Sequence, residues 1–395
     1  MPQMLIAIVG GRLQGIEAAY LCSKAAFATM LIDSDSNPPA KGLSDEFHKI
    51  DIVAKPEKAR HLLRRCDAVL PTNENRTTLL ILQRLCDELQ IPFMQDNEAF
   101  WTTSNKTKSM SLLRKSRIPT PKTWPNSGFP VIVKPSSKSG SESVYRADNP
   151  RQLENNLKIV RQVDSNPVVQ EFIDGAALSL EVMSTKGVGR PLQITGLEFD
   201  ERYGCKRVYA PVEVTSKVRE RMRMIGMEIA SSLRLNGLID VQALLKGATP
   251  RVNEINARLP SQTPSVVYHS TKINMVELLT RLFLKERPLS VRIHSQLAVL
   301  YQHVIVLGKE LRVQGEHVMA DAWDLRLKKD FLGADEAITN LEFGTDASNR
   351  VATLIVKSRD LVSASKKMDE VVGNIMNQYH LDHYTDPSPS RGYHS

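Results

Sequence analysis

Acidic, amide and basic side chains recur at every second position in two segments of the chain. Glu254, Asn256 and Arg258 form one set, and Asp240 and Gln242 form the other. Because successive side chains of a β-strand point to opposite faces, each set would share one face of its strand. Oxygen ligands of this kind suit Mg²⁺, which usually shares them with substrate phosphates. The plainer alternative is the solvent-facing polar side of an antiparallel sheet, and one polar face alone does not separate the two.

The two segments are close enough in the chain to form a hairpin. Strands are predicted over residues 238–245 and 250–255, and the residues between them, 247–250, are turn formers. Pairing of these strands would bring the two polar faces onto one surface. That surface would carry several oxygen ligands and one guanidinium group.

A lysine beside a small-residue loop gives a second chemical signal. Lys134 ends a predicted strand that begins at Val131, and residues 136–143 contain five serines and one glycine. A lysine at a strand end can reach a phosphate as a point charge, and small residues let backbone N–H groups approach phosphate oxygens. By itself this pattern fits an ordinary flexible hairpin loop equally well.

The N-terminal residues predict a βαβ unit. A glycine loop at residues 10–15 separates the first apolar strand from a helix over 16–25, and a second strand follows over 28–32. The glycines do not fit the dinucleotide fingerprint, and Ile16-Glu17 replace the Lys-Ser/Thr pair of a P-loop. We therefore predict neither NAD binding nor Walker-type nucleotide binding here, while contact with another small ligand stays open.

A polar cluster follows the next predicted parallel strand, Ala68–Pro71. Residues 72–75 are Thr, Asn, Glu and Asn, and they precede a helix predicted over 76–89. The carboxyl ends of such strands are where open α/β sheets bind ligands. The alternative is that Thr72 or Asn73 caps the helix, and the sequence favours neither.

Composition excludes several classes of function. The 395 residues are 42% hydrophobic and 24% charged, and no apolar run approaches the roughly 20 residues that span a bilayer. The four cysteines form no C-x-x-C pair, and the start of the chain does not resemble a signal peptide, so we expect a cytoplasmic protein with reduced thiols. The net charge of +8 is not concentrated among aromatic residues, so no nucleic-acid partner is expected.

The order of these features resembles the ATP-grasp superfamily over about residues 1–290. The matching positions are Lys106, the segment 131–143, the segment Val168–Gly175, Gln242, and the segment 254–258. The resemblance implies an α/β and α+β protein with a Rossmann-like N-terminal domain and two subdomains that grip ATP. We place these at 1–100, 101–175 and 176–385, with a disordered tail at 386–395. One departure is Ala177, where many relatives carry glutamate, although Ser179 and Glu181 still fit.

The resemblance also implies roles for individual residues, with ATP and Mg²⁺ as cofactors. Lys134 and Arg258 would be catalytic. ATP would contact Lys106, Lys134, Ser137, Ser139, Gly140, Glu171, Ile173 and Ser179. The metal would be held by Gln242, Glu254 and Asn256. Amino-acid substrates would contact Leu13, Gln14, Glu74, Asn75, Glu181, Arg258, Ser261 and Thr263.

Residues 10–20 and 256–264 resemble a narrower group, the amino-acid ligases of pyrrolysine biosynthesis. This resemblance implies L-lysine and 3-methyl-D-ornithine as small-molecule substrates and an acyl phosphate intermediate. One alternative keeps the fold but uses another amino acid or bicarbonate. Another is a nucleotide-binding protein without turnover, against which the presence of every lysine and metal ligand argues. No membrane partner is expected, and the sequence leaves a homodimer open.

Overall fold

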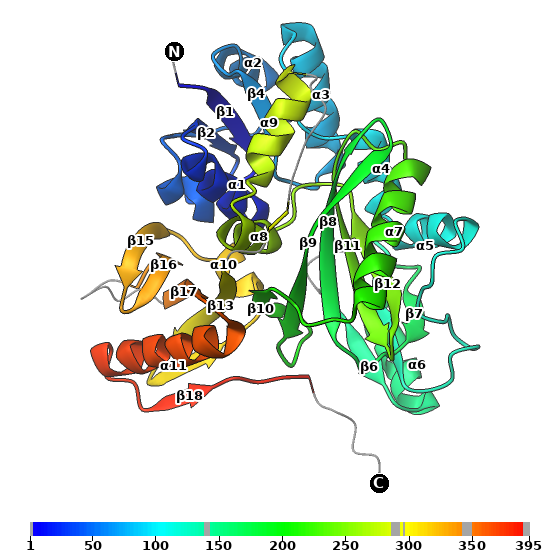
Figure 1. Cartoon of the computed structure of the whole chain (residues 1–395). Helices are drawn as coiled ribbons and strands as arrows, with labels where there is room; N and C mark the ends of the chain where they lie inside the picture. Colours follow the sequence, from blue (N-terminus) through cyan, green and yellow to red (C-terminus); the bar gives the residue numbers. More distant parts are fainter. Residues whose placement is uncertain (1–2, 138–142, 286–292, 295–296, 342–349, 390–395) are drawn as a thin grey trace.

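The structure, a computed structural model, describes residues 3–137, 143–285, 293–294, 297–341 and 350–389 (Figure 1). These residues form three β-sheets, which are covered by helices. No helix in the described ranges is both long and apolar enough to cross a membrane.

The N-terminal sheet is parallel, with strand order β3-β2-β1-β4. The predicted βαβ unit is present, but its helix begins at Leu13 rather than Ile16, and β3 was not predicted. Buried aliphatic side chains on both faces of the central strands explain the sheet's apolar sequence. The elements are β1 (Leu5–Val9), α1 (Leu13–Lys24), β2 (Ala28–Asp33), η1 (Pro39–Leu43), β3 (Glu46–Lys49), α2 (Pro56–Leu63), β4 (Ala68–Pro71) and α3 (Arg76–Leu89).

A small antiparallel sheet follows, with strand order β6-β5-β7, and one helix packs on it. The two helices that precede it pack instead against β12 of the large sheet. This segment therefore supplies parts to both walls of the site described below. Its elements are α4 (Asn97–Thr103), α5 (Lys106–Lys115), β5 (Val131–Lys134), β6 (Tyr145–Ala147), α6 (Pro150–Val160) and β7 (Val168–Glu171).

The largest sheet has eleven strands in the described part of the chain, and nine of them follow the order β12-β11-β8-β9-β10-β13-β17-β16-β15. The strands are β8 (Ala177–Thr185), β9 (Val188–Phe199), β10 (Cys205–Ala210), β11 (Gly237–Lys246), β12 (Thr249–Asn256), β13 (Ala298–Leu307), β14 (Glu310–Val313), β15 (Arg326–Phe331), β16 (Ala334–Thr339), β17 (Arg350–Ser358) and β18 (His383–Thr385). The sequence predicted no strand after β12, so the six later strands were missed.

Five helices pack around this sheet in the described ranges (Figure 1). They are α7 (Ser216–Ser232), α8 (Thr263–Thr271), α9 (Met275–Lys285), α10 (His317–Ala320) and α11 (Leu361–Gln378). Helix α7 covers β8 and β9 through Val218, Met222 and Ile225, while its basic residues lie away from this buried face. The basic residues of α7 therefore form the polar side of an amphipathic helix.

The predicted tail needs a correction at its beginning. Residues 386–389 belong to the described chain, and Asp386 and Ser388 accept hydrogen bonds from the buried Lys206. The proline- and serine-rich composition suggested disorder, but a buried ammonium group requires oxygen partners and finds them here. Residues 390–395 lie outside the described residues.

Candidate active site

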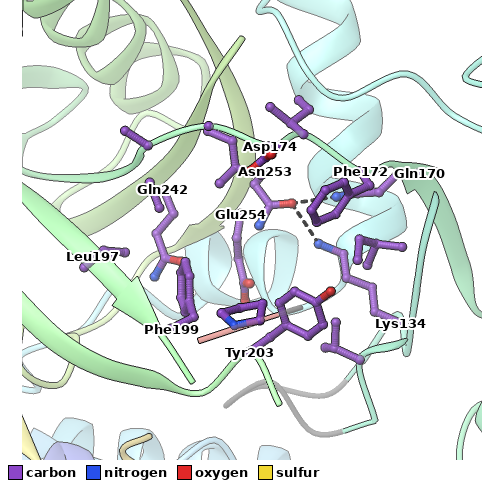
Figure 2. A pocket seen from close by; sticks show the side chains of 18 of the residues that line it. Lys134, Gln170, Phe172, Asp174, Leu197, Phe199, Tyr203, Gln242, Asn253 and Glu254 are labelled. Atoms are coloured by element: carbon purple, nitrogen blue, oxygen red, sulfur yellow. Dashed lines mark hydrogen bonds between the residues drawn. The ribbon is translucent and has the colours of Figure 1, made fainter. Parts of the chain in front are cut away.

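A cavity of about 510 Å³ lies between the small sheet and the large sheet (Figure 2). Its walls come from β5 and β7 on one side and from β9, β10, β11 and β12 on the other. Six of the residues that the sequence predicted to contact ATP or metal line it together. They are Lys106, Lys134, Glu171, Ile173, Gln242 and Glu254.

The two predicted phosphate lysines lie at the same cavity. The Lys134 ammonium is buried and donates to Asn253 Oδ1 at 3.1 Å, which also accepts from Gln170 at 2.6 Å (Figure 2). Lys106 begins α5, and its Nζ lies 3.9 Å from Glu254 Oε1. Burial lowers the pKa of Lys134 to about 8, against the opposing effect of Glu254. The site therefore holds a desolvated cation that gains from an anionic ligand.

The predicted polar face is confirmed as a feature of the sheet. In the register, Gln242 pairs with Glu254 and Asp240 pairs with Asn256 across β11 and β12. The turn beyond β11 contains Gly247 in a left-handed conformation with φ of 58°, which suits glycine. Alternation along two paired strands therefore places all four polar side chains on one surface, as the hairpin prediction required.

Asp240 orients the two amide side chains of this surface. It is 1% exposed, and its Oδ2 accepts from Gln242 Nε2 at 2.8 Å and from Asn256 Nδ2 at 3.4 Å. Since each amide nitrogen faces Asp240, each amide oxygen is directed elsewhere. The two oxygens and the Glu254 carboxylate are hard donors of the kind that Mg²⁺ prefers, so this donor set fits the metal that the resemblance to the ATP-grasp superfamily implies. The sequence placed Asp240 on this face but gave it no role of its own.

Ser179 and Glu181 do not occupy their predicted positions. Both are 0% exposed, neither lines the cavity, and the Ser179 hydroxyl lies 2.6 Å from Asp240 Oδ1 and 3.0 Å from Glu181 Oε1. A hydroxyl has only one hydrogen to donate, so one carboxyl must carry a proton. Burial, together with the neighbouring Asp240, raises the pKa of Glu181 to about 8. Glu181 is thus a buried neutral acid at neutral pH, and ATP does not reach Ser179 in this arrangement.

The start of the serine-rich loop is anchored by Asp164. Its Oδ2 accepts from the backbone and the hydroxyl of Ser136 at 2.7 and 2.8 Å, and from those of Ser137 at 3.2 and 3.1 Å. Partial burial acts in the opposite direction, but hydrogen bonds from Asn166, Ser136 and Ser137 lower the pKa of Asp164 to about 2. The Ser137 hydroxyl is therefore engaged within the protein. Ser139 and Gly140 lie outside the described residues.

Two of the residues predicted to contact ATP, Glu171 and Ile173, lie where the small sheet joins the large one. Glu171 uses its N–H to bond Lys122 O at 2.7 Å, and its carboxylate pairs with Lys246. Ile173 lines the cavity, and Gly175 then passes so close to Leu245 that a Cβ atom would lie 1.9 Å from the Leu245 carbonyl oxygen. Only glycine permits this approach, which fixes the connection between the two walls.

A second cavity of about 770 Å³ lies at the carboxyl edge of the N-terminal sheet. Gln14 Nε2 donates to Glu74 Oε1 at 3.0 Å, and the same oxygen accepts from Arg258 Nε at 2.8 Å. Glu74 is therefore already paired, and this pairing links the second cavity to the predicted catalytic arginine. Four residues predicted to bind substrate line this cavity, namely Leu13, Gln14, Glu74 and Asn75.

The helix that follows this cluster is capped by Asn75, whose Oδ1 accepts from Thr78 N at 3.0 Å. The alternative weighed from the sequence named Thr72 or Asn73 as the cap, and that choice was wrong. These two side chains instead donate to Gly10 O and Val9 O and tie β4 to β1. Asn75 thus has a structural role beside the cavity.

The segment after β12 turns away from both cavities. Thr263, at the start of α8, is 4% exposed, and its side-chain hydrogen bond lowers the pKa of Glu181. Thr263 therefore packs behind the polar surface that β11 and β12 form. Ser261 is half-buried and lines neither cavity. Gln262 between them adopts a φ of 75° and bonds to His303 at 2.7 Å. The structure therefore does not bring Ser261 and Thr263 to Glu74.

Several cavity residues carried no recognisable sequence signal. Phe199 is the last residue of β9, Tyr203 lies in the connection between β9 and β10, and Ser388 comes from the C-terminal segment (Figure 2 shows Phe199 and Tyr203). Asn253 was missed because strict alternation would place it on the opposite face from Glu254, whereas a register shift leaves it as an extra residue of β12 and both side chains line the cavity. Its bond to Lys134 depends on the fold of two distant segments, which no local spacing reveals.

Comparison with protein families matches the part of the chain that contains this site. Residues 103–262 match the ATP-grasp domain. The chain is 35% identical to the 3-methyl-D-ornithine–L-lysine ligase of Methanosarcina barkeri over 278 residues, which covers 70% of this chain and 73% of that protein. It is 34% identical to the enzyme of the same name from Methanosarcina acetivorans, with 70% and 73% of the two chains covered.

Solved structures with a similar fold include a biotin carboxylase domain and an L-amino acid ligase. The biotin carboxylase domain of the Hydrogenobacter thermophilus 2-oxoglutarate carboxylase, in complex with MgADP and bicarbonate, has a TM-score of 0.73 at 16% identity, with 94% of this chain and 90% of that chain covered. An L-amino acid ligase from Bacillus licheniformis has a TM-score of 0.68 at 18% identity, with 94% and 98% covered. At these identities the likeness concerns the fold, and it confirms the predicted fold class.

Proposed function

The chain belongs to the ATP-grasp family as an ATP-dependent carboxylate–amine ligase, and on this premise we propose that it joins 3-methyl-D-ornithine to L-lysine in pyrrolysine biosynthesis. The observation that carries the site assignment is the convergence of Lys106 and Lys134 with the Gln242–Glu254 pair across one cavity. The substrate pair is supported by the relatives, which are 35% and 34% identical to this chain.

An amine does not displace the oxygen of a carboxylate readily, because that oxygen is a poor leaving group, so the carboxylate has to be activated first. The ornithine carboxylate would attack the γ-phosphorus of ATP, giving an acyl phosphate and ADP. The ε-amine of lysine would then attack the acyl carbon, and inorganic phosphate and a proton would leave as the amide forms. Such chemistry depends mainly on positioning and on stabilisation of phosphate charge.

The cavity contains residues that can hold the phosphates, the metal and the acyl phosphate. Lys134 and Lys106 would hold the phosphates, since both are cations at a partly buried site. Mg²⁺, held by Gln242, Glu254 and Asn256, would supply charge neutralisation between the phosphates. Arg258 would hold the acyl phosphate end, next to the second cavity.

The second cavity would receive an amino acid. Leu13, Gln14 and Glu74 line it, and Glu74 pairs with Arg258, which follows the predicted metal ligands of β12 in the chain. The lysine ε-amine must lose a proton before it attacks, because its usual pKa is near ~10.4. Glu181, which the sequence predicted to contact an amino-acid substrate, is fully buried and lines neither cavity, so our proposal gives it no part in this proton loss. A carboxylate such as Glu74 can pair with a substrate ammonium through simple charge attraction.

The test is ADP release from ATP and Mg²⁺ with L-lysine and 3-methyl-D-ornithine supplied singly and together, followed by mass measurement of the product. We expect ADP release only with both amino acids, with an amide of matching mass. D-ornithine in place of the methylated substrate measures how much the methyl group matters. One methyl is worth only about 1–3 kcal/mol of discrimination, so D-ornithine should be a weaker substrate.

Other outcomes would redirect the proposal. Release that requires bicarbonate or a different amino acid would keep the ATP-grasp ligase or carboxylase chemistry and reject this substrate pair. Nucleotide binding without release under any of these conditions would favour a binding protein. A K134M variant tested in parallel should lose ADP release and so exclude a contaminating ATPase.

A further inference from the structure

The C-terminal segment adds strand β18 to the large sheet and then reaches the cavity that we assign to ATP. Strand β18 pairs in parallel with β14, with Glu310 opposite His383, and the chain continues from there (Figure 1). Ser388 and Pro389 then line the same cavity as Lys134 and Glu254. The last described residues are thus part of the wall of the nucleotide site.

A β-bulge directs one lysine toward this segment. Between β9 and β10 the register shifts, because Cys205 pairs with Phe199 and Arg207 pairs with Glu198, which leaves Lys206 as the extra residue. Bulges re-aim side chains and are common beside active sites. The Lys206 side chain is only 2% exposed.

The Lys206 ammonium is surrounded by oxygen atoms of the C-terminal segment. It donates to Asp386 Oδ1 at 2.5 Å, to Pro387 O at 2.6 Å and to Ser388 Oγ at 3.1 Å. An ammonium group has three hydrogens, so these bonds use all of them. Lys206 therefore has no N–H hydrogen left to donate to a phosphate in this arrangement. It holds residues 386–388 in place instead.

Asp386 is held from a second side. Arg207 donates to Asp386 Oδ2 at 2.7 Å, while the same guanidinium also pairs with Glu198, which lines the cavity. Both carboxylate oxygens of Asp386 are thus bonded to cations of β10. The Ser388 hydroxyl accepts from Lys206, so its own hydrogen remains available to donate.

We propose that residues 386–389 are a binding element of the nucleotide site, docked on Lys206 and Arg207 through Asp386, and that Ser388 donates to an oxygen of the bound adenine nucleotide. The inference rests on the proposed assignment of this cavity to ATP. Lys206 and Asp386 are positioning residues in this arrangement, and Ser388 is the residue that contacts the ligand.

The experiment is calorimetric titration of the full chain with ADP and Mg²⁺, without amino acids. D386N removes the charge that holds the segment, and S388A removes the Ser388 hydroxyl, which is the proposed donor to the nucleotide and one of the three acceptors of Lys206. Each should raise the Kd for ADP by about three- to tenfold, the range that the loss of one or two hydrogen bonds produces. D382N is the matched control, because Asp382 belongs to the same segment but forms an exposed pair with Lys309 at 3.7 Å. Its Kd should equal that of the wild type.

Melting curves without ligand separate docking from general damage. S388A keeps the backbone, the Lys206–Asp386 pair and two of the three acceptors of Lys206, so its melting temperature should fall less than that of D386N. Wild-type affinity in both D386N and S388A would overturn the inference. Tighter binding in D386N or after deletion of residues 386–395 would overturn it too, since the segment would then be a plug. A wild-type chain that binds no ADP would refute the nucleotide assignment itself.

Discussion

Removal of Asp240 tests whether one buried carboxylate orients the metal ligands. In D240A the amide nitrogens of Gln242 and Asn256 lose their common acceptor, and Ser179 loses the partner at 2.6 Å. The two amides are then free to rotate, so their oxygens no longer face the metal in one fixed arrangement. Neither amide is itself changed, which makes the effect one of orientation.

The size of the effect follows from these contacts. Two hydrogen bonds to a charged acceptor are lost, each with a net value of about 1.5–3 kcal/mol. Loss of a residue that orients metal ligands typically lowers metal affinity by about 10- to 100-fold, or about 1.4–2.7 kcal/mol. We expect the free Mg²⁺ concentration for half-maximal ADP release to rise by that factor. D240N, which keeps one acceptor oxygen, should give a smaller rise.

The assay is steady-state ADP release with MgATP fixed and free Mg²⁺ varied. S179A is the control, because it removes one bond to Asp240 but leaves both amides held. It should lower the melting temperature while its Mg²⁺ requirement stays near that of the wild type. A folded D240A protein with the wild-type Mg²⁺ requirement would refute the orienting role, and an equal shift in S179A would show that general loosening was responsible.

Three further outcomes are expected. Because burial raises the pKa of Glu181 to about 8, its carboxyl keeps a proton on folding that the unfolded chain releases near its usual value. Its contribution to stability is therefore lost as the pH rises from about 5 to 8. In urea unfolding, the free energy of unfolding of the wild type should fall over this pH range relative to that of E181Q. E181Q should also remain active. An E181Q protein that is folded but inactive would restore a catalytic role for Glu181. Because burial lowers the pKa of Lys134 to about 8, kcat/KM for ATP should fall above that pH and K134R should remove the fall, whereas an unchanged profile in K134R would assign it to another group. E74Q should raise the KM for L-lysine by about three- to tenfold without changing that for ATP, and an unchanged lysine KM would exclude Glu74 from the substrate site.

Local pattern was sufficient where the chemistry follows from neighbouring strands. The opposition of Gln242 and Glu254 follows from alternation along two strands and a short turn, so it could be predicted before any fold was known. The same holds for Lys134 at the end of β5, because a buried apolar run ends there. The helix predicted over residues 76–89 likewise matches the bounds of α3.

The misplaced residues depend on contacts between distant parts of the chain. Ser179 and Glu181 alternate correctly along β8, but both side chains are fully buried, Ser179 against Asp240 of the neighbouring strand β11 and Glu181 against Thr263 at the start of α8, so ligand does not reach them. The six strands after β12 were missed although two-residue turns with a glycine, Gly308-Lys309 and Leu332-Gly333, join β13 to β14 and β15 to β16. The docking of Asp386 on Lys206 joins residues 180 positions apart, so composition alone suggested a disordered tail. A buried cation in a bulge cannot be recognised from its local sequence.

The distribution of charge explains why amides and a protonated acid surround Asp240. The cavity presents the cations Lys106 and Lys134, while Glu254 is the carboxylate that faces them among the predicted metal ligands. If Gln242 and Asn256 were carboxylates, Asp240 would lie against two like charges and could not hold them by donated hydrogen bonds. Amide ligands accept that anchor and still offer oxygens to a cation. Protonation of Glu181 removes one more negative charge behind this surface, so the anionic phosphates of a nucleotide meet little repulsion from the buried acids.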